Sequence, residues 1–259
     1  MAWSLYHEEQ FDQAETFFSE QSNRFEDGPL SFDALMMIAE CRYQRQDFQS
    51  ALEAYKVTRA RIIANDESAK NLPDPSERQV REIALLHGGQ SAAQLEQWSE
   101  AIQWYDELRD RFPSTIYLAE VFYESGFAHQ RLGNNSVALE LLNEVASNYR
   151  NEIAARARFM IGEIYFGDDK LELAIPEFQR VMFGFGSENA PASIKNWQAK
   201  SGFEAGRCSE LLIVKTRTAN AKQKAKQIAI DFYEYVIDKH PNHDLAATSR
   251  ERLEVIQGE

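Results

Sequence analysis

Apolar residues recur along the chain at helical spacing, and one arrangement of small and large residues returns several times. Six alanines mark the returns: Ala14, Ala51, Ala101, Ala138, Ala174 and Ala229. By subtraction they lie 37, 50, 37, 36 and 55 residues apart. A small residue stands twelve positions before each of the first five: Ala2, Ala39, Gly89, Gly126 and Gly162. A large apolar residue stands four positions after all six: Phe18, Tyr55, Tyr105, Leu142, Phe178 and Tyr233. Such regular spacing indicates an internal repeat.

Each repeat predicts a pair of antiparallel helices. The residues four, seven and eleven positions after the repeated alanine fall on one helical face, and most of them are apolar. Turn residues separate the two helices, as in GNN at 133–135 and GDD at 167–169. Pro113 and Pro241 each follow a second helix, which proline cannot continue. One hairpin cannot bury its own apolar face, so we expect neighbouring hairpins to stack.

The repeat spacing predicts one domain over residues 1–259. The hairpins are expected at about 1–28, 30–64, 78–113, 115–150, 152–186 and 193–241, with a capping helix at 242–259. The first hairpin is short, so the chain opens either on a stub or within a longer repeat protein. We expect loops at 65–78 and 184–193, longer helices in the sixth hairpin because of the inserted stretch 211–226, and a mild kink at Pro176.

The composition agrees with a helical fold and limits the function. Only 12 Gly and 7 Pro occur in 259 residues, which favours helices over sheets. The net charge of −13 argues against nonspecific nucleic-acid binding, because the phosphate backbone would be repelled. No apolar run has the length of a transmembrane helix. The start of the sequence, MAWSLYHEEQ, lacks the basic and apolar segments of a signal peptide.

The repeated pattern resembles the tetratricopeptide repeat family over nearly the whole chain. The matching residues are the small residue of the first helix (Ala39, Gly89, Gly126, Gly162), the large residue that opens the second (Phe48, Trp98, Leu171), the repeated alanine, the large residue after it and the closing proline. The resemblance implies an all-α, right-handed α-solenoid of about six hairpins. It also implies a non-catalytic role as a protein–protein interaction scaffold or adaptor.

Two segments resemble a bacterial cell-envelope branch of that family. They are FPSTIYLAEVFYESGFAHQRLG at 112–133 and NYRNEIAARARFMIGEIYFGDD at 148–169. The branch includes the outer-membrane barrel-assembly lipoprotein and the Tol–Pal coordinator of division, so the resemblance implies envelope assembly in the periplasm or cell envelope. The sequence shows no lipobox cysteine, which leaves the compartment open.

The same resemblance implies a concave groove lined by the first helix of each hairpin. Its predicted partner-binding residues are Tyr43, Tyr123, Phe127, Gln130, Arg156, Phe159, Phe166, Lys200, Phe203 and Arg207. Aromatic residues and arginine are common anchors for a bound partner, so we expect a peptide or helix to lie along this groove. The three cations would receive a carboxylate. The alternative is that the aromatic side chains pack between neighbouring helices and bind nothing.

Several other motifs have a structural interpretation. Cys41 and Cys208 occupy the same repeat position four repeats apart, which is too far for a disulfide bond. The tripeptide GGQ at 88–90 resembles the catalytic loop of release factors, but it falls inside a predicted helix, where we interpret Gly89 as a packing residue. The sequon NNS at 134–136 falls in a predicted turn, and we interpret it as turn chemistry.

Two charged clusters complete the set of candidates. His240, His243 and Asp244 lack a third strong metal ligand, so we predict no metal site and no cofactor. A basic stretch, Lys215, Arg217, Lys222, Lys224 and Lys226, is interpreted as a solvated surface, with an acidic partner or an anionic membrane as the alternative. Two other functions stay open: a structural segment without a ligand, and a metal-dependent hydrolase.

Overall fold

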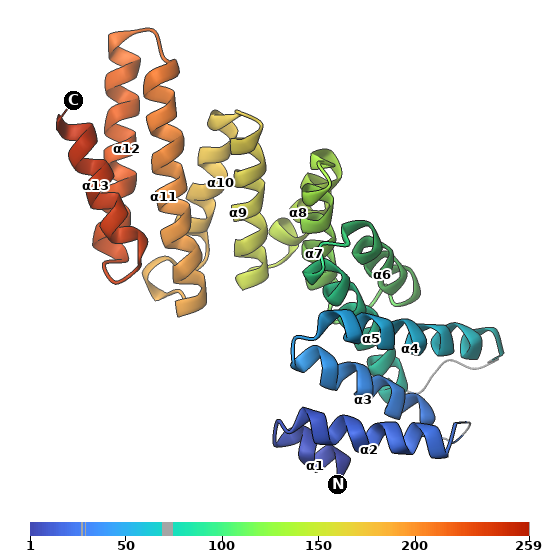
Figure 1. Ribbon diagram of the computed structural model, residues 1–259. Coiled ribbons are helices and arrows are strands. Elements are labelled where there is room, and N and C mark those ends of the chain that lie inside the picture. The colour runs from blue at the N-terminus through green and yellow to red at the C-terminus, as the bar shows by residue number, and fades with distance from the viewer. Residues whose placement is uncertain (27, 29, 69–74, 259) are drawn as a thin grey trace. The chain divides into compact units, whose positions relative to one another are not determined.

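The computed structural model describes residues 1–26, 28, 30–68 and 75–258, and these residues form helices and no strand (Figure 1). The chain divides into two compact units, Met1–Asn134 and Asn135–Glu259. The division falls in the turn between α7 and α8. The expected all-α fold of the repeat-solenoid type is confirmed.

Unit 1 contains α1 to α7. Their bounds are α1 Ala2–His7, α2 Phe11–Arg24, α3 Ser31–Gln44, α4 Phe48–Ser68, α5 Pro75–Gln94, α6 Trp98–Arg111 and α7 Leu118–Arg131. Each helix packs against the next one along the chain. In addition, α3 packs on α5 and α5 on α7, so these three first helices of successive hairpins form one layer. We call its surface the α3–α5–α7 face.

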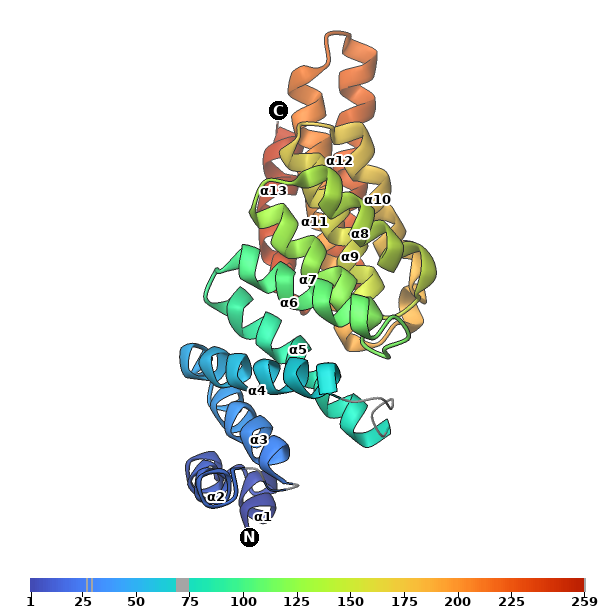
Figure 2. The same ribbon diagram turned by 90° about the vertical axis from the view of Figure 1, so that its right-hand side faces the viewer.

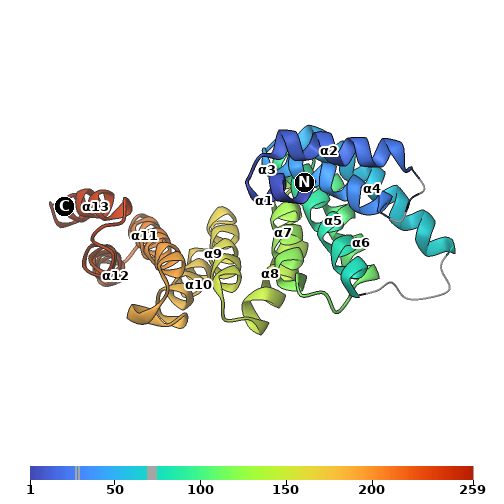
Figure 3. The same cartoon turned by 90° about the horizontal axis from the view of Figure 1, so that it is seen from below.

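Unit 2 contains α8 to α13. Their bounds are α8 Asn135–Asn148, α9 Glu152–Gly167, α10 Leu171–Gly184, α11 Ala192–Lys215, α12 Ala219–Lys239 and α13 Leu245–Gly258, with a 3-10 turn at Ser187–Asn189. Figure 3 shows α9, α11 and α13 on one side of the unit and α10 and α12 on the other. Because α11 contacts both α9 and α13, the first three form a layer, whose surface we call the α9–α11–α13 face.

The spacing between the small residue and the large residue has a direct steric cause. A Cβ atom added to Gly89 would lie 2.5 Å from the ring of Tyr105, and one on Gly206 would lie 2.7 Å from the ring of Tyr233. In each case the ring belongs to the second helix of the same hairpin and packs on the backbone of the first. The small residue therefore lets the two helices of a hairpin approach closely.

The GGQ tripeptide is explained by the same packing. A Cβ atom on Gly88 would lie 2.7 Å from the ring of Trp104, which is fully buried. Two neighbouring glycines thus accept two neighbouring aromatic rings of α6. A glycine inside a helix costs about 1 kcal/mol relative to alanine. Here the close packing of Trp104 and Tyr105 offsets that cost.

The turns inside the hairpins share one backbone conformation. The residue five positions before each of the first five repeated alanines has a positive φ: Glu9 60°, Gln46 61°, Glu96 58°, Gly133 77° and Asp169 62°. The residue after each one donates a backbone hydrogen bond to the carbonyl five positions earlier, as in Asp47 to Arg42 and Lys170 to Tyr165. This is the Schellman ending of a helix, in which the left-handed residue allows the chain to reverse. Only one of the five positions is a glycine.

One loop prediction is partly wrong and one helix prediction is confirmed. Within the loop expected at 65–78, residues 65–68 belong to α4 and residues 75–78 to α5; residues 69–74 lie outside the described part. Proline is compatible with the first turn of a helix, where its missing N–H leaves no bond unmade. The inserted stretch lengthens both α11 and α12, so their tip stands clear of the rest of unit 2 (Figures 1 and 2).

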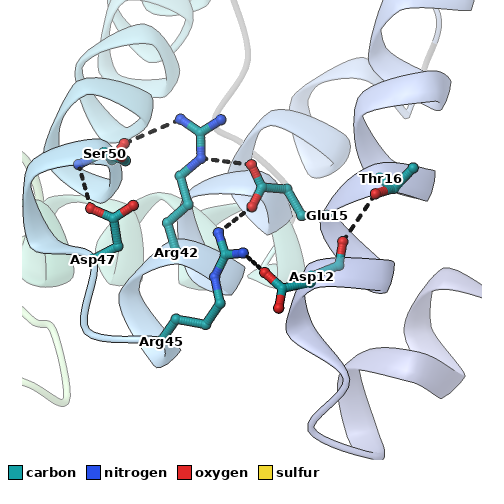
Figure 4. Close-up of polar contacts among 7 residues, drawn as sticks. All are labelled: Asp12, Glu15, Thr16, Arg42, Arg45, Asp47 and Ser50. Carbon is teal, nitrogen blue, oxygen red and sulfur yellow. Dashed lines mark hydrogen bonds and ion pairs between the residues drawn. The ribbon is translucent and has the colours of Figure 1, made fainter.

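A cluster of ion pairs joins α2 to α3 (Figure 4). Arg42 donates from Nε to Oε1 of Glu15 at 2.8 Å, and Arg45 pairs with both Glu15 and Asp12. At the start of α4, Asp47 accepts a hydrogen bond from the backbone N–H of Ser50. Arg42 lies in the last turn of α3, the first helix of its hairpin, and Arg45 is the residue that caps the end of that helix. They therefore tie that hairpin to the preceding one.

Candidate interaction surface

A tryptophan lies on the α9–α11–α13 face, near the start of α11. The ring of Trp197, on α11, lies 5.3 Å from the ring of Phe159, on α9, with an angle of 56° between the planes. Two cations flank it: Lys200 Nζ lies 4.4 Å from the Trp197 ring centroid and the Arg156 guanidinium carbon 5.8 Å. A cation over an aromatic face is attracted by the ring's quadrupole. The helix spacing explains the arrangement, because Trp197 and Lys200 lie one turn apart.

A second aromatic–cation pair lies further along the same two helices. The guanidinium carbon of Arg207, on α11, lies 5.1 Å from the ring centroid of Phe166, on α9. Arg207 also donates to Glu204 at 2.9 Å, so part of its charge is neutralised within the helix. The face thus repeats the same chemistry twice along its length.

The carboxylate of Glu163 lies between these cations. Its side chain is exposed, but the surrounding groups desolvate the carboxyl group. This desolvation, followed by the charge of Glu204, raises the pKa of Glu163, and the charges of Lys200 and Arg207 lower it by less. Because the net shift of the pKa is upward, the surroundings favour the protonated, neutral form of Glu163. Lys200 has no ion-pair partner among the described residues.

The predicted groove residues of unit 2 do not all face solvent. Phe159 is buried, contrary to the prediction, because it packs on Phe178 as well as on Trp197. Phe203 is half-buried and packs on Tyr233 at 5.8 Å. Arg156, Phe166 and Lys200 are half-buried, and Arg207 is exposed. The structure therefore brings together Arg156, Phe159 and Lys200 around Trp197, and pairs Phe166 with Arg207.

In unit 1 the predicted residues are held by contacts within the protein. Tyr43 donates from its hydroxyl to Gln90 Oε1 at 2.7 Å, and Gln90 Nε2 donates to Glu120 Oε1 at 2.7 Å. The Tyr43 ring also stacks on His87 at 4.5 Å. Burial, together with the charge of Glu40, raises the pKa of Tyr43 to about 12. These bonds link the three helices of the α3–α5–α7 face.

The other three predicted residues of unit 1 lie on α7. Tyr123 is buried, so the expectation that it faces solvent is wrong, because its position lies within the packed layer. Phe127 is half-buried and meets Trp98 edge-on at 5.5 Å. Gln130 is half-buried as well. This face of unit 1 is organised mainly by its own packing.

Sequence reasoning missed Trp197, which contacts Phe159, Lys200 and Arg156 on this surface. The predicted positions of α11 began at Lys200, and Trp197 lies one helical turn before it on the same side. Extending the pattern of one face by one turn would have found it. Nothing in the repeat pattern pointed to His87, which joins the polar chain of unit 1 by stacking.

The histidine cluster is engaged in hydrogen bonds. His243 Nε2 lies 2.9 Å from Asn196 Oδ1, and His240 Nε2 lies 3.3 Å from the Tyr235 hydroxyl. Burial lowers the pKa of His240. No group of three or more His, Cys, Asp or Glu side chains is arranged for a metal ion in the part of the chain that the structure describes. Among the same residues, no helix combines the length and apolarity needed to cross a bilayer.

Comparison with known proteins agrees with the repeat. A family model described as tetratricopeptide repeat matches residues 1–67 and 123–191. No curated protein sequence matches. Members of this family generally mediate protein–protein interactions.

Solved structures show the same fold at low sequence identity. The MamA protein is 16% identical, with a TM-score of 0.58 over 83% of this chain and 94% of its own. A tetratricopeptide repeat protein from Parabacteroides merdae is 13% identical, with a TM-score of 0.60 over 99% of this chain and 96% of its own. YrrB, a TPR protein with an unusual peptide-binding site, is 17% identical, with a TM-score of 0.53 over 90% and 97%.

Proposed function

Because the chain belongs to the tetratricopeptide repeat family, we propose that it is a non-catalytic scaffold that holds a protein partner on the α9–α11–α13 face of unit 2. The observation that carries the proposal is the ring of Trp197 with Lys200 and Arg156 beside it. Tryptophan and arginine are enriched among residues that dominate binding energy at interfaces. The peptide-binding site of YrrB supports a peptide as the kind of ligand.

The chemistry of the face specifies the partner. Apolar side chains of a peptide would pack on Trp197, and a carboxylate beside them would pair with Lys200. Glu163 and Glu204 compete for the same cations, so the partner's carboxylate must displace part of an existing interaction. Such competition lowers affinity and makes binding sensitive to salt.

Affinity capture followed by charge substitution tests the proposal. A partner would first be captured with the whole chain, and the peptide of it that binds would be identified. The dissociation constant of this peptide would then be measured for the wild type, Lys200→Glu, Glu163→Gln and a control variant. We expect Lys200→Glu to weaken binding at least tenfold and Glu163→Gln to strengthen it. Lys222→Glu, which changes an exposed cation on α12, outside the three helices of this face, is the matched control. A partner peptide bound equally by the wild type and Lys200→Glu would refute this location.

The residues predicted in unit 1, Tyr43, Tyr123, Phe127 and Gln130, form a secondary part of the proposal. Tyr43 is held by a hydrogen bond to Gln90 and Tyr123 is buried, which leaves Phe127 and Gln130 as the half-buried candidates. Phe127→Ala is the informative change, because Phe127 contacts Trp98 only at its edge. Weaker capture of the same partner with unchanged stability would support a direct contact, and lost stability with unchanged capture would support packing alone.

We also propose envelope assembly as the specific role, on the resemblance of segments 112–133 and 148–169 to that branch. The test is where the captured partner resides. Repeated capture of outer-membrane or periplasmic proteins would support the role. Capture of cytoplasmic proteins alone, by the wild type and not by Lys200→Glu, would refute it and leave the scaffold function intact.

A further inference from the structure

A small pocket lies in unit 1 between α1, α3 and α5, and we call it the Trp3 pocket. It has a volume of about 190 Å³. α1 lines it with Trp3 and Tyr6, α3 with Asp33, Met36 and Glu40, and α5 with Ile83. Sites that hold a whole drug-sized molecule measure about 300–1,000 Å³. The Trp3 pocket is smaller, so it has room for a single side chain of a ligand.

The charge of the lining has one sign. Asp33 and Glu40 are its charged side chains, and both are carboxylates; the other lining side chains are aromatic or apolar. Burial, followed by the charge of Glu40, raises the pKa of the Tyr6 hydroxyl to about 12, which agrees with a negative potential at this place. A pocket whose charges are all negative favours a cation.

Glu40 has an oxygen that can accept a hydrogen bond from a ligand. Its side chain is only 8% exposed. The Tyr55 hydroxyl donates to Oε1, and Nδ1 of His87 lies 2.7 Å from the same oxygen. Oε2 accepts no hydrogen bond from any residue that the structure describes. Because deeply placed carboxylate oxygens normally accept hydrogen bonds, a donor that enters the pocket has a partner here.

Trp3 offers an exposed ring beside these carboxylates. The ring meets Tyr6 edge-on at 6.2 Å and Phe18 edge-on at 5.7 Å, and Trp3 nevertheless remains 52% exposed. Among aromatic rings, that of tryptophan attracts a cation most strongly. Lysine and arginine carry their charge on an apolar stem, which packs on apolar surface while the charged end reaches a polar group. The Trp3 pocket provides both kinds of contact.

We propose that the Trp3 pocket binds a lysine or arginine side chain of a protein partner. The stem of that side chain packs on Met36 and Ile83 beside the ring of Trp3. Its charged end donates to Glu40 and lies near Asp33. The charge preference is opposite to that of the α9–α11–α13 face, and the inference does not depend on the function proposed for that face.

Short blocked peptides test the selectivity of the pocket on the whole chain. The probes are Ala-Lys-Ala, Ala-Arg-Ala, Ala-Glu-Ala and Ala-norleucine-Ala, each acetylated and amidated; norleucine keeps an apolar stem without the charge. The indole N–H signal of Trp3 in NMR spectra, assigned with Trp3→Phe, reports binding. We expect the lysine or arginine peptide to shift this signal to saturation. Its dissociation constant should be at least about fivefold lower than that of the norleucine peptide, because a charged group is hydrogen-bonded.

Three variants locate the binding. Asp33→Lys reverses an exposed charge of the lining and should raise the dissociation constant of the cationic peptide at least about tenfold. Asp110→Lys makes the same change at an exposed carboxylate on α6, which does not line the pocket, and is the matched control. Lys200→Glu, on the α9–α11–α13 face, should leave the response of Trp3 unchanged. Circular dichroism checks the fold of each variant.

Four results would overturn the proposal. One is equal affinity for the lysine, arginine and norleucine peptides, which would mean that the pocket selects apolar surface alone. Another is tighter binding of Ala-Glu-Ala. The third is a Trp3 signal that neither cationic peptide shifts at millimolar concentration. The fourth is equal weakening by Asp33→Lys and Asp110→Lys, since the net charge of the chain would then explain the binding.

Discussion

The ring of Phe178 lies against the backbone of Gly162 so closely that a Cβ atom on Gly162 would lie 2.6 Å from the ring. Gly167, five residues later in the same helix, has no atom within 4 Å of such a Cβ. The two glycines therefore have different reasons to be present. Gly162 permits close packing between helices, whereas a side chain at Gly167 would meet no neighbouring atom.

Alanine at these two positions should have opposite effects. We expect Gly162→Ala to lower the free energy of unfolding by about 1–3 kcal/mol, because the added methyl group forces the Phe178 ring to move. Gly167→Ala should be neutral or raise it by up to about 1 kcal/mol, because alanine favours the helix. Urea unfolding of both variants makes the comparison. Equal effects of the two substitutions would contradict the steric explanation.

The left-handed turn residues predict a stabilising glycine. Glu96 has a φ of 58°, where a Cβ atom is strained and a glycine is not. We expect Glu96→Gly to raise the free energy of unfolding by about 0.5–1 kcal/mol. Gln94→Gly, at the last residue of α5, should lower it, by less than the cost of about 1 kcal/mol that a glycine has inside a helix. If the midpoint of thermal unfolding changes in the same direction for both variants, the left-handed conformation assigned to Glu96 is contradicted.

The cluster in Figure 4 predicts unequal contributions from two carboxylates that share Arg45. The side chain of Glu15 is 16% exposed and also pairs with Arg42, whereas that of Asp12 is 81% exposed. We expect Glu15→Gln to lower the free energy of unfolding by about 1 kcal/mol and Asp12→Asn to lower it by less than about 0.5 kcal/mol, because exposed ion pairs are screened by water and salt. Chemical denaturation in 0.05 M and 1 M salt is the measurement. A larger effect for Asp12 would refute the ranking.

The position of Glu163 predicts a pH-dependent effect on stability. Its pKa in the folded state lies above the ordinary value of 4.5, so ionising this group costs the folded state more than the unfolded state. The stability that it contributes is present at pH values below the ordinary pKa and is lost as the pH rises through the raised pKa. We therefore expect Glu163→Gln to be more stable than the wild type at pH 7.

The stability gained by Glu163→Gln over the wild type should decrease as the pH falls from 7 toward 4. Urea unfolding of both proteins at pH 7 and pH 4 measures this difference. Glu234→Gln, an exposed carboxylate on α12, controls for the change in net charge. An advantage that is equal at both pH values, or larger at pH 4, would contradict the direction of the pKa shift.

Hairpin structure could be predicted from the sequence because its causes are local. A large side chain at one position requires a small residue sixteen positions earlier, as in Gly162 and Phe178. This pairing of residue types at a fixed spacing can be recognised in the sequence. The end of α4 was missed, since Asn65–Ser68 is polar and looked like a loop but continues the helix. A polar composition alone does not distinguish the end of a helix from a loop.

The candidate surface was predicted less well because exposure depends on neighbours outside the repeat. Phe159 and Trp197 lie on different hairpins, and only the packing of α9 on α11 decides which ring is covered. The repeat pattern could not give the depth at which a side chain lies in its helix face.

Cys41 and Cys208 have a consequence beyond packing. Both thiols are fully buried, and burial raises the pKa of each to about 12, so neither reacts at neutral pH while its surroundings stay folded. Cys41 belongs to unit 1 and Cys208 to unit 2. The chain thus carries one natural reporter of local opening in each half. The order in which a thiol reagent modifies the two, followed by mass spectrometry, would reveal whether the halves open together or one at a time.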